Sequence, residues 1–96
     1  MHDDFTMNVY GWMVKVTNSP NELLVLALIY AYHEKGIECK FSYIDLAISL
    51  NMSKSSAQLS IKKLTDKGII KVDSNFDENG GNLPNTYRFV SKGVKL

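Results

Sequence analysis

Apolar and polar positions along the chain fall into three helical blocks followed or joined by shorter strand-like segments. The first block begins at Ser19, which can cap a helix whose first residue is Pro20, and it ends at Gly36. Its apolar residues are almost continuous from 23 to 32, more than the single stripe that a surface helix needs. This pattern predicts a helix that is central in the fold or also forms an interface.

Two more helical blocks follow with only a short break between them. Ser42 begins a capping box for the first, and Asn51 suits the left-handed residue that ends it. Ser53 can cap the second, which runs over 54–67 without Gly or Pro. This arrangement is typical of a helix-turn-helix. We expect the inward stripe of the first of these helices to comprise Ile44, Leu46, Ala47, Ile48 and Leu50.

Strand-like segments complete the pattern. Residues 69–72 and 86–90 are expected to form a hairpin, and 37–41 a short third strand that pairs with it. Residues 5–16 are rich in aromatic and β-branched side chains, which predicts a strand or an irregular arm packed on the domain. The order of elements predicts a mainly α fold with a small β-sheet (α+β). This is a winged helix-turn-helix with three helices plus a β-hairpin wing.

The 96 residues suffice for a single domain spanning 1–96, with an N-terminal arm at 1–18 and a short tail at 91–96. The most apolar run falls well short of the roughly 20 residues that a membrane helix needs, and the start of the chain lacks signal-peptide features. We therefore expect a cytoplasmic protein that does not engage a membrane. The single cysteine, Cys39, suits a reducing compartment.

The formal net charge of +1 conceals an uneven distribution. Residues 1–50 carry three lysines against six acidic residues, whereas 51–72 carry five lysines against one aspartate. Positive charge is thus concentrated on the second helix of the motif, as phosphate binding requires. An ordinary solvated helix face would explain these lysines equally well.

Several segments resemble the N-terminal winged-helix domain of replication initiator proteins from phages and plasmids of Gram-positive bacteria. The resemblance runs over residues 10–90, which is most of the chain, and it implies a winged-helix fold, DNA binding and a role in replication. Its segments are YGWMVK at 10–15, NELLVLALIYAY at 21–32, YIDLAISLNMSKSSAQ at 43–58, IKKLTDKGIIK at 61–71 and NTYRF at 85–89.

The second helix of the motif is expected to enter the major groove of DNA. Ala57, Ile61 and Leu64 are spaced to face the core, so the remaining residues point outward. Gln58 could bond to adenine edges and Leu59 could contact a thymine methyl, although Leu59 could also be a peripheral core residue or a protein-binding anchor. The candidate DNA-binding residues are Ser53, Lys54, Ser55, Ser56, Gln58, Leu59, Lys62, Lys63, Lys67, Lys71 and Arg88.

Two functions fit these features. The first is sequence-specific binding of double-stranded DNA, as a small regulator or a replication-associated protein of a phage or other mobile element, with a homodimer left open. The alternative is a winged-helix protein-interaction module that no longer reads DNA, such as a phage-encoded inhibitor of a host protein, with a host or replication protein as its partner. Leu59 and the acidic wing tip at Asp77 and Glu78 favour the alternative.

No catalytic or metal-binding pattern is present in the sequence. His2 and His33 lie far apart without Cys or carboxylate neighbours at ligand spacing, and the Gly80–Gly81 pair lacks the lysine and following helix of a nucleotide-binding loop. We therefore expect neither an enzyme nor a cofactor or metal.

Overall fold

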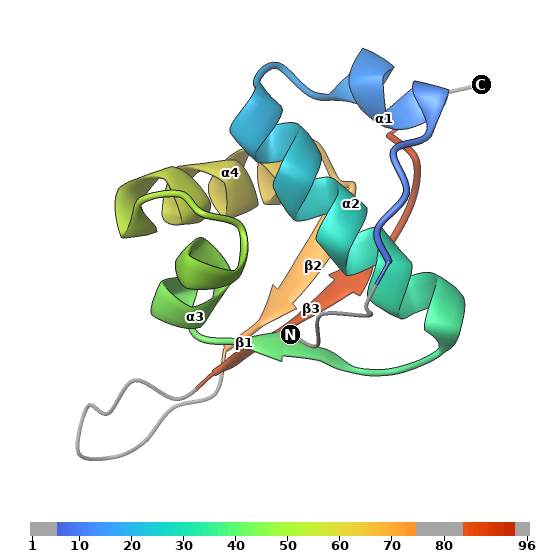
Figure 1. Ribbon diagram of the computed structural model, residues 1–96. Helices are drawn as coiled ribbons and strands as arrows, with labels where there is room; N and C mark the ends of the chain where they lie inside the picture. Colours follow the sequence, from blue (N-terminus) through green and yellow to red (C-terminus); the bar gives the residue numbers. More distant parts are fainter. Residues whose placement is uncertain (1–5, 75–83, 94–96) are drawn as a thin grey trace.

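The computed structural model describes residues 6–74 and 84–93, and within these ranges it has four helices and one three-stranded antiparallel sheet (Figure 1). This winged-helix-like α+β architecture confirms the expected fold class. The tip of the wing, with Asp77 and Glu78, lies outside the described residues. The elements in chain order are α1 (Gly11–Val16), α2 (Pro20–Lys35), β1 (Cys39–Phe41), α3 (Tyr43–Ser49), α4 (Lys54–Asp66), β2 (Ile70–Asp73) and β3 (Asn85–Phe89).

Helix α1 corrects the expectation of a strand or an irregular arm in the N-terminal segment. Its residue Met13 is fully buried, and the Trp12 ring packs against Tyr30 of α2 and Phe89 of β3, with centroids 5.1 and 5.6 Å away. The hydroxyl of Thr17 donates to the carbonyl of Met13 at 2.8 Å and closes the helix. Packing onto α2 and β3 therefore outweighs the β-propensity of this stretch.

Helix α2 is the central element of the fold, which is one of the two alternatives that the sequence predicts for it. Residues 25–29 are all buried, because α1, α4 and the sheet cover different sides of the helix (Figure 1). The Ser19 hydroxyl accepts from the backbone amide of Glu22 at 3.2 Å, and Gly36 ends the helix in the left-handed conformation with φ 69°. Local capping thus fixes both ends of the helix around which the other elements pack.

The sheet has the order β1-β3-β2, so the wing hairpin is joined by a short third strand, as expected. Cys39 and Val72 both pair with Tyr87, which places this tyrosine in the middle of the sheet. Its hydroxyl donates to the carbonyl of Phe41 at 3.3 Å. Pairing of β1 begins at Cys39, two residues later than the sequence predicts.

The turn between α3 and α4 follows the expected capping. The hydroxyls of Ser42 and Ser53 accept from backbone amides in the first turns of the two helices, and Asn51 adopts φ 55°. The expected inward stripe of α3 is wrong at two positions, because Ile44 and Ile48 are 45% and 73% exposed. At about 100° per residue, Ile48 lies about 150° around the helix from the centre of the buried residues. Those buried residues are Leu46, Ala47 and Leu50.

Candidate nucleic-acid interface

Helix α4 has one buried face and one open face. Ala57, Ile61 and Leu64 are buried, as the sequence predicts, and α4 contacts both α2 and α3. Leu59 is 53% exposed, so it is not a core residue. Two interpretations remain for this residue, a contact with a thymine methyl and an anchor for a protein partner. The open face also carries the exposed residues Ser55, Gln58, Lys62 and Lys63.

The start of α4 is held by its own serines. The Ser53 hydroxyl accepts from the amide of Ser56 at 3.0 Å and donates to the hydroxyl of Ser56 at 2.9 Å. The Ser53 hydroxyl therefore caps the helix and the Ser56 hydroxyl is bonded to it, so a DNA contact by either would have to share these groups. Ser55, between them and exposed, is the serine best placed to contact a ligand.

The lysines near the open face are available for phosphate. Lys54 and Lys63 are exposed, and Lys62 forms an ion pair with Asp66, one helical turn away, at 2.8 Å. The two side chains of this pair are largely exposed, and surface pairs of this kind contribute only about 0.3–0.5 kcal/mol. Lys62 can thus exchange its partner for a phosphate at little cost.

Lys67 does not belong to this group, contrary to the sequence-based expectation. Its ammonium donates to the carbonyl of Val16 at 2.8 Å, to the side-chain oxygen of Asn18 and to a carboxylate oxygen of Glu22. An ammonium has three donors, and all three are used within the fold. The Glu22 side chain is 0% exposed, so taking Lys67 away would leave a buried carboxylate without its cation.

Sequence reasoning missed this ion pair because its partners are 45 residues apart. The capping pattern Ser19-x-x-Glu22 was visible, and Glu22 does accept from a backbone amide, that of Asn18, at 2.9 Å. Nothing in that local pattern points to Lys67. The local sequence offered one signal, a lysine at the C-terminal cap of a helix, where the helix dipole favours positive charge.

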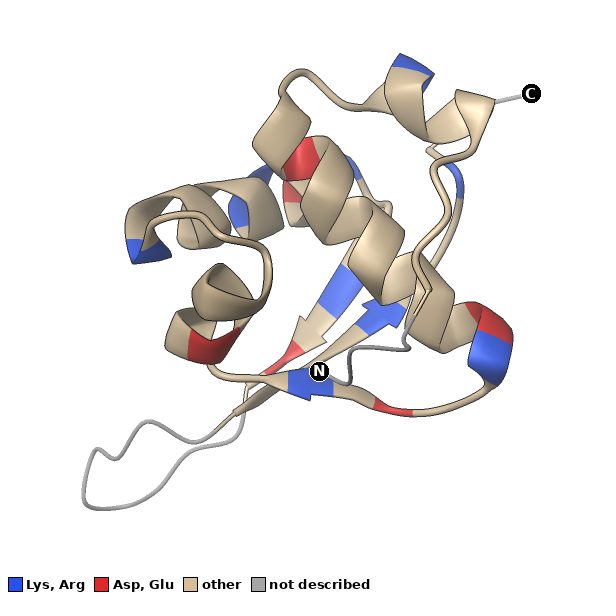
Figure 2. Cartoon of the chain, in the orientation of Figure 1, with Lys and Arg blue, Asp and Glu red and all other residues tan. Residues whose placement is uncertain are grey.

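A second basic group lies on the outer face of the sheet. Lys71 of β2 and Arg88 of β3 are exposed cross-strand neighbours, and Lys40 of β1 shares their side of the sheet. Each of the three strands thus carries a basic residue (Figure 2). An Asp73 carboxylate oxygen lies 2.9 Å from an Arg88 Nη atom. The sheet thus presents cations that are separate from those of α4, so Lys71 and Arg88 are not part of the α4 face.

Within residues 6–74 and 84–93, no group of three or more His, Cys, Asp and Glu side chains could hold a metal ion. Burial raises the pKa of the Cys39 thiol to about 12, so this cysteine is a neutral thiol at pH 7 rather than a nucleophilic thiolate. In the same described ranges, no helix is long and apolar enough to cross a membrane.

The family of the chain follows from a profile described as a helix-turn-helix domain, which matches residues 19–70. The match runs from the N-cap of α2 to the first residue of β2 and contains the whole of α3, the turn and α4. The chain belongs to this helix-turn-helix family. A comparison with curated proteins finds no match.

The fold of this helix-turn-helix protein is also similar to that of a solved structure, titled "Possible transcriptional regulator from Methanosarcina mazei Go1". The TM-score is 0.66 at 20% sequence identity, and the alignment covers 93% of this chain and 78% of that chain. Identity at this level shows a shared fold. The narrower resemblance to replication initiators stays a prediction.

Proposed function

We propose that this helix-turn-helix protein binds double-stranded DNA sequence-specifically by inserting the first turns of α4 into the major groove. The observation that carries the proposal is the open face of α4, which lies opposite its buried face and is flanked by lysines. The membership of the helix-turn-helix family supports the same function. In this class of domain, the N-terminal residues of the second helix contact base edges.

Three exposed residues of that face contact the bases in this proposal. The Gln58 amide can bond to both the N6 and N7 positions of adenine, and the Leu59 methyls can contact a thymine methyl. The Ser55 hydroxyl can donate to or accept from a base edge. Together they favour a site that contains A·T pairs.

Lys54, Lys62 and Lys63 on α4 bind phosphates in this proposal. Ser53 and Ser56 act indirectly, because the hydrogen bond between them caps the start of the helix that enters the groove. Three phosphate contacts predict a slope of about −3 in a plot of log affinity against log salt concentration. Lys71 and Arg88 would add to this slope only if the DNA also reaches the sheet. Lys67 is left out of the proposed contacts because of its bond to Glu22.

The biological role that we propose is regulation at a DNA site, in transcription or in replication of a phage or other mobile element. The similar structure is described as a possible transcriptional regulator, which supports transcription, and the resemblance of residues 10–90 to initiator domains supports replication. Such a protein would act in the cytoplasm, where its DNA lies. A homodimer would read two half-sites, and its presence would appear as symmetry in the bound sequence.

A second candidate function is that of a protein-interaction module, and the exposure of two large apolar side chains favours it. Ile48 and Leu59 place large apolar side chains in solvent on both helices of the motif. Single exposed apolar residues are common on protein surfaces, so these two do not outweigh the polar and basic character of the rest of the α4 face. A host or replication protein would be the partner in this case.

Selection of bound sequences from random duplexes, followed by affinity measurements over a salt series, tests the proposal. Lys63→Ala should weaken binding and reduce the magnitude of the salt slope by about 1. Lys15→Ala on α1 removes the same charge from an exposed position and should change neither. No binding at low salt, or equal losses in the two variants, would refute DNA binding by α4.

A further inference from the structure

Strand β2 lies at an edge of the sheet. Among the described residues it pairs with β3 and with no other strand. The amide of Val90 donates to the carbonyl of Ile69 at 2.8 Å, so these two residues form a hydrogen-bonded pair of the antiparallel ladder. Backbone groups alternate in direction along a strand, so Lys71 bonds toward β3, whereas the amide and carbonyl of Val72 point outward from the edge. This edge can therefore bond to a further strand.

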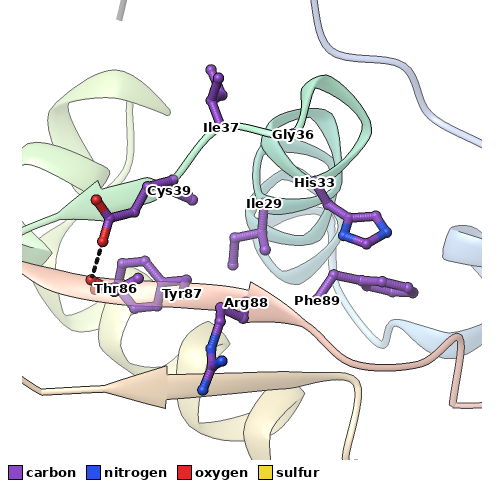
Figure 3. A pocket seen from close by; sticks show the side chains of 10 residues that line it. Ile29, His33, Gly36, Ile37, Cys39, Thr86, Tyr87, Arg88 and Phe89 are labelled. Carbon is purple, nitrogen blue, oxygen red and sulfur yellow. Dashed lines mark hydrogen bonds between the residues drawn. The ribbon is translucent and has the colours of Figure 1, made fainter.

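The outer face of β2 carries a cation and an anion two residues apart. Lys71 lies directly opposite Arg88 in the ladder, where like charges repel each other. Figure 3 shows the Arg88 side chain directed from β3 toward β2, and an Nη atom of Arg88 lies 2.9 Å from an Asp73 carboxylate oxygen. Within residues 6–74 and 84–93, Lys71 has no ion pair. Its charge is thus available to a carboxylate beyond the edge.

The charges of β2 are complementary to those of a second β2 strand. An antiparallel pair of identical strands has twofold symmetry, and its register must bring outward-pointing backbone groups opposite each other. Centring the pair on residue 72 puts Lys71 of each copy opposite Asp73 of the other copy. Centring it on residue 71 or 73 would put two lysines or two aspartates opposite each other, which is unfavourable. Charge therefore favours the register centred on Val72.

Backbone and side chains both gain partners in this register. Val72 exchanges two backbone hydrogen bonds with Val72 of the second copy, and its half-buried side chain covers the same side chain there. Lys71 and Asp73 form non-hydrogen-bonded pairs, in which cross-strand side chains approach most closely. A carboxylate can accept about four hydrogen bonds, so Asp73 can bind a lysine of the second copy while it keeps Arg88.

We propose that β2 is a homodimer interface of this protein. Two copies join edge to edge through their β2 strands, in an antiparallel register centred on Val72, and form one continuous sheet. The two Lys71–Asp73 pairs on the outer face set the register and oppose other registers. The interface is separate from the open face of α4 and does not depend on DNA, so its failure would leave the proposed DNA binding untouched.

Sedimentation equilibrium without DNA tests the dimer. Over protein concentrations from about 10 µM to about 1 mM, the mean mass should rise from 10.8 kDa toward twice that value, as for a small and transient interface. Lys71→Asp puts aspartates opposite each other and Asp73→Lys puts lysines opposite each other, so each should weaken self-association about tenfold. Lys40→Asp makes the same change on β1, at the other edge of the sheet, and should leave the mass curve unchanged.

A mixture of the two charge variants tests the register. One Lys71→Asp chain and one Asp73→Lys chain restore both lysine–aspartate pairs, so the equimolar mixture should associate nearly as tightly as the parent. In the ¹⁵N-labelled parent, the amide chemical shift of Val72 should change with protein concentration, whereas that of Phe41 in β1 should stay constant. A parent that remains monomeric, charge variants that associate like the parent, or a mixture no tighter than its components would overturn the proposal.

Discussion

The bond between Lys67 and Glu22 predicts a large, specific loss of stability when only one partner is removed. Lys67→Met keeps most of the side-chain length and removes the ammonium, which leaves the buried Glu22 carboxylate without its cation and with the hydrogen bond that it accepts from the amide of Asn18. Breaking a buried pair in this way costs about 3–5 kcal/mol. Because the Lys67 side chain is 30% exposed, water can replace part of the interaction, and we expect the lower end of this range.

A loss of about 3 kcal/mol is a large share of the 5–15 kcal/mol that stabilises a typical domain, and it corresponds to a fall in melting temperature of about 12–24 °C at this size. Urea unfolding followed by the fluorescence of the single tryptophan, Trp12, measures the change directly. Trp12 is a suitable probe because it packs between α2 and β3.

Two further variants separate the ion pair from other effects. Glu22→Gln combined with Lys67→Met leaves no uncompensated charge, so the double variant should recover to within about 1 kcal/mol of the parent. Lys63→Met makes the same substitution at an exposed position of α4 and should change stability by less than about 0.5 kcal/mol. A loss below about 1 kcal/mol in Lys67→Met, or a double variant no more stable than the single one, would refute the assigned role of Lys67.

Three other outcomes are expected. Asn51→Ala should destabilise the protein by about 1 kcal/mol relative to Asn51→Gly in the same urea assay, because Asn51 sits at φ 55°. Burial raises the pKa of the Cys39 thiol from 9.0 to about 12 and the pKa of the Tyr87 hydroxyl from 10.0 to about 12. Both groups therefore stay protonated to a higher pH in the folded state than in the unfolded state. The contribution of these two groups to the free energy of unfolding should be fully present below about pH 8 and should fall as pH rises toward 12. The fall should be shallower in Cys39→Ala, and a free energy of unfolding that does not change over this pH range would contradict the prediction. Gln58→Ala should reduce discrimination at one A·T pair by about 1–3 kcal/mol in a competition binding assay without lowering the melting temperature, and uniform weakening on all sequences would argue against base reading.

Local hydrogen bonding made much of the fold predictable. The caps at Ser19, Ser42 and Ser53 and the left-handed Asn51 each depend on residues within one helical turn, so sequence spacing alone identifies them. The buried face of α4 follows from helical periodicity in the same way. These signals define where the helices begin and end, and hence the helix-turn-helix.

Non-local packing decided what the sequence did not reveal. Residues 11–16 form a helix because Met13 and Trp12 have partners on α2 and β3, which no local pattern indicates. Ile48 looked like a core residue, but the seven residues of α3 offer only one face to its neighbours α4 and β1. The error at α1 concerns contacts between distant parts of the chain, and the error at α3 concerns a helix face that stays exposed to solvent.

Helix α4 divides into an anchored end and an open end, and this division bears on how it could read DNA. Lys67 at its C-terminal cap binds α2 and the residue that ends α1, so the axis of the helix is fixed from the end away from the proposed groove contacts. Ser55 and Leu59 lie in the first two turns and are exposed. A recognition helix gains specificity when its orientation is set in advance, because less ordering has to accompany binding. Substitutions at the anchored end should thus act on stability, and those in the first two turns on affinity.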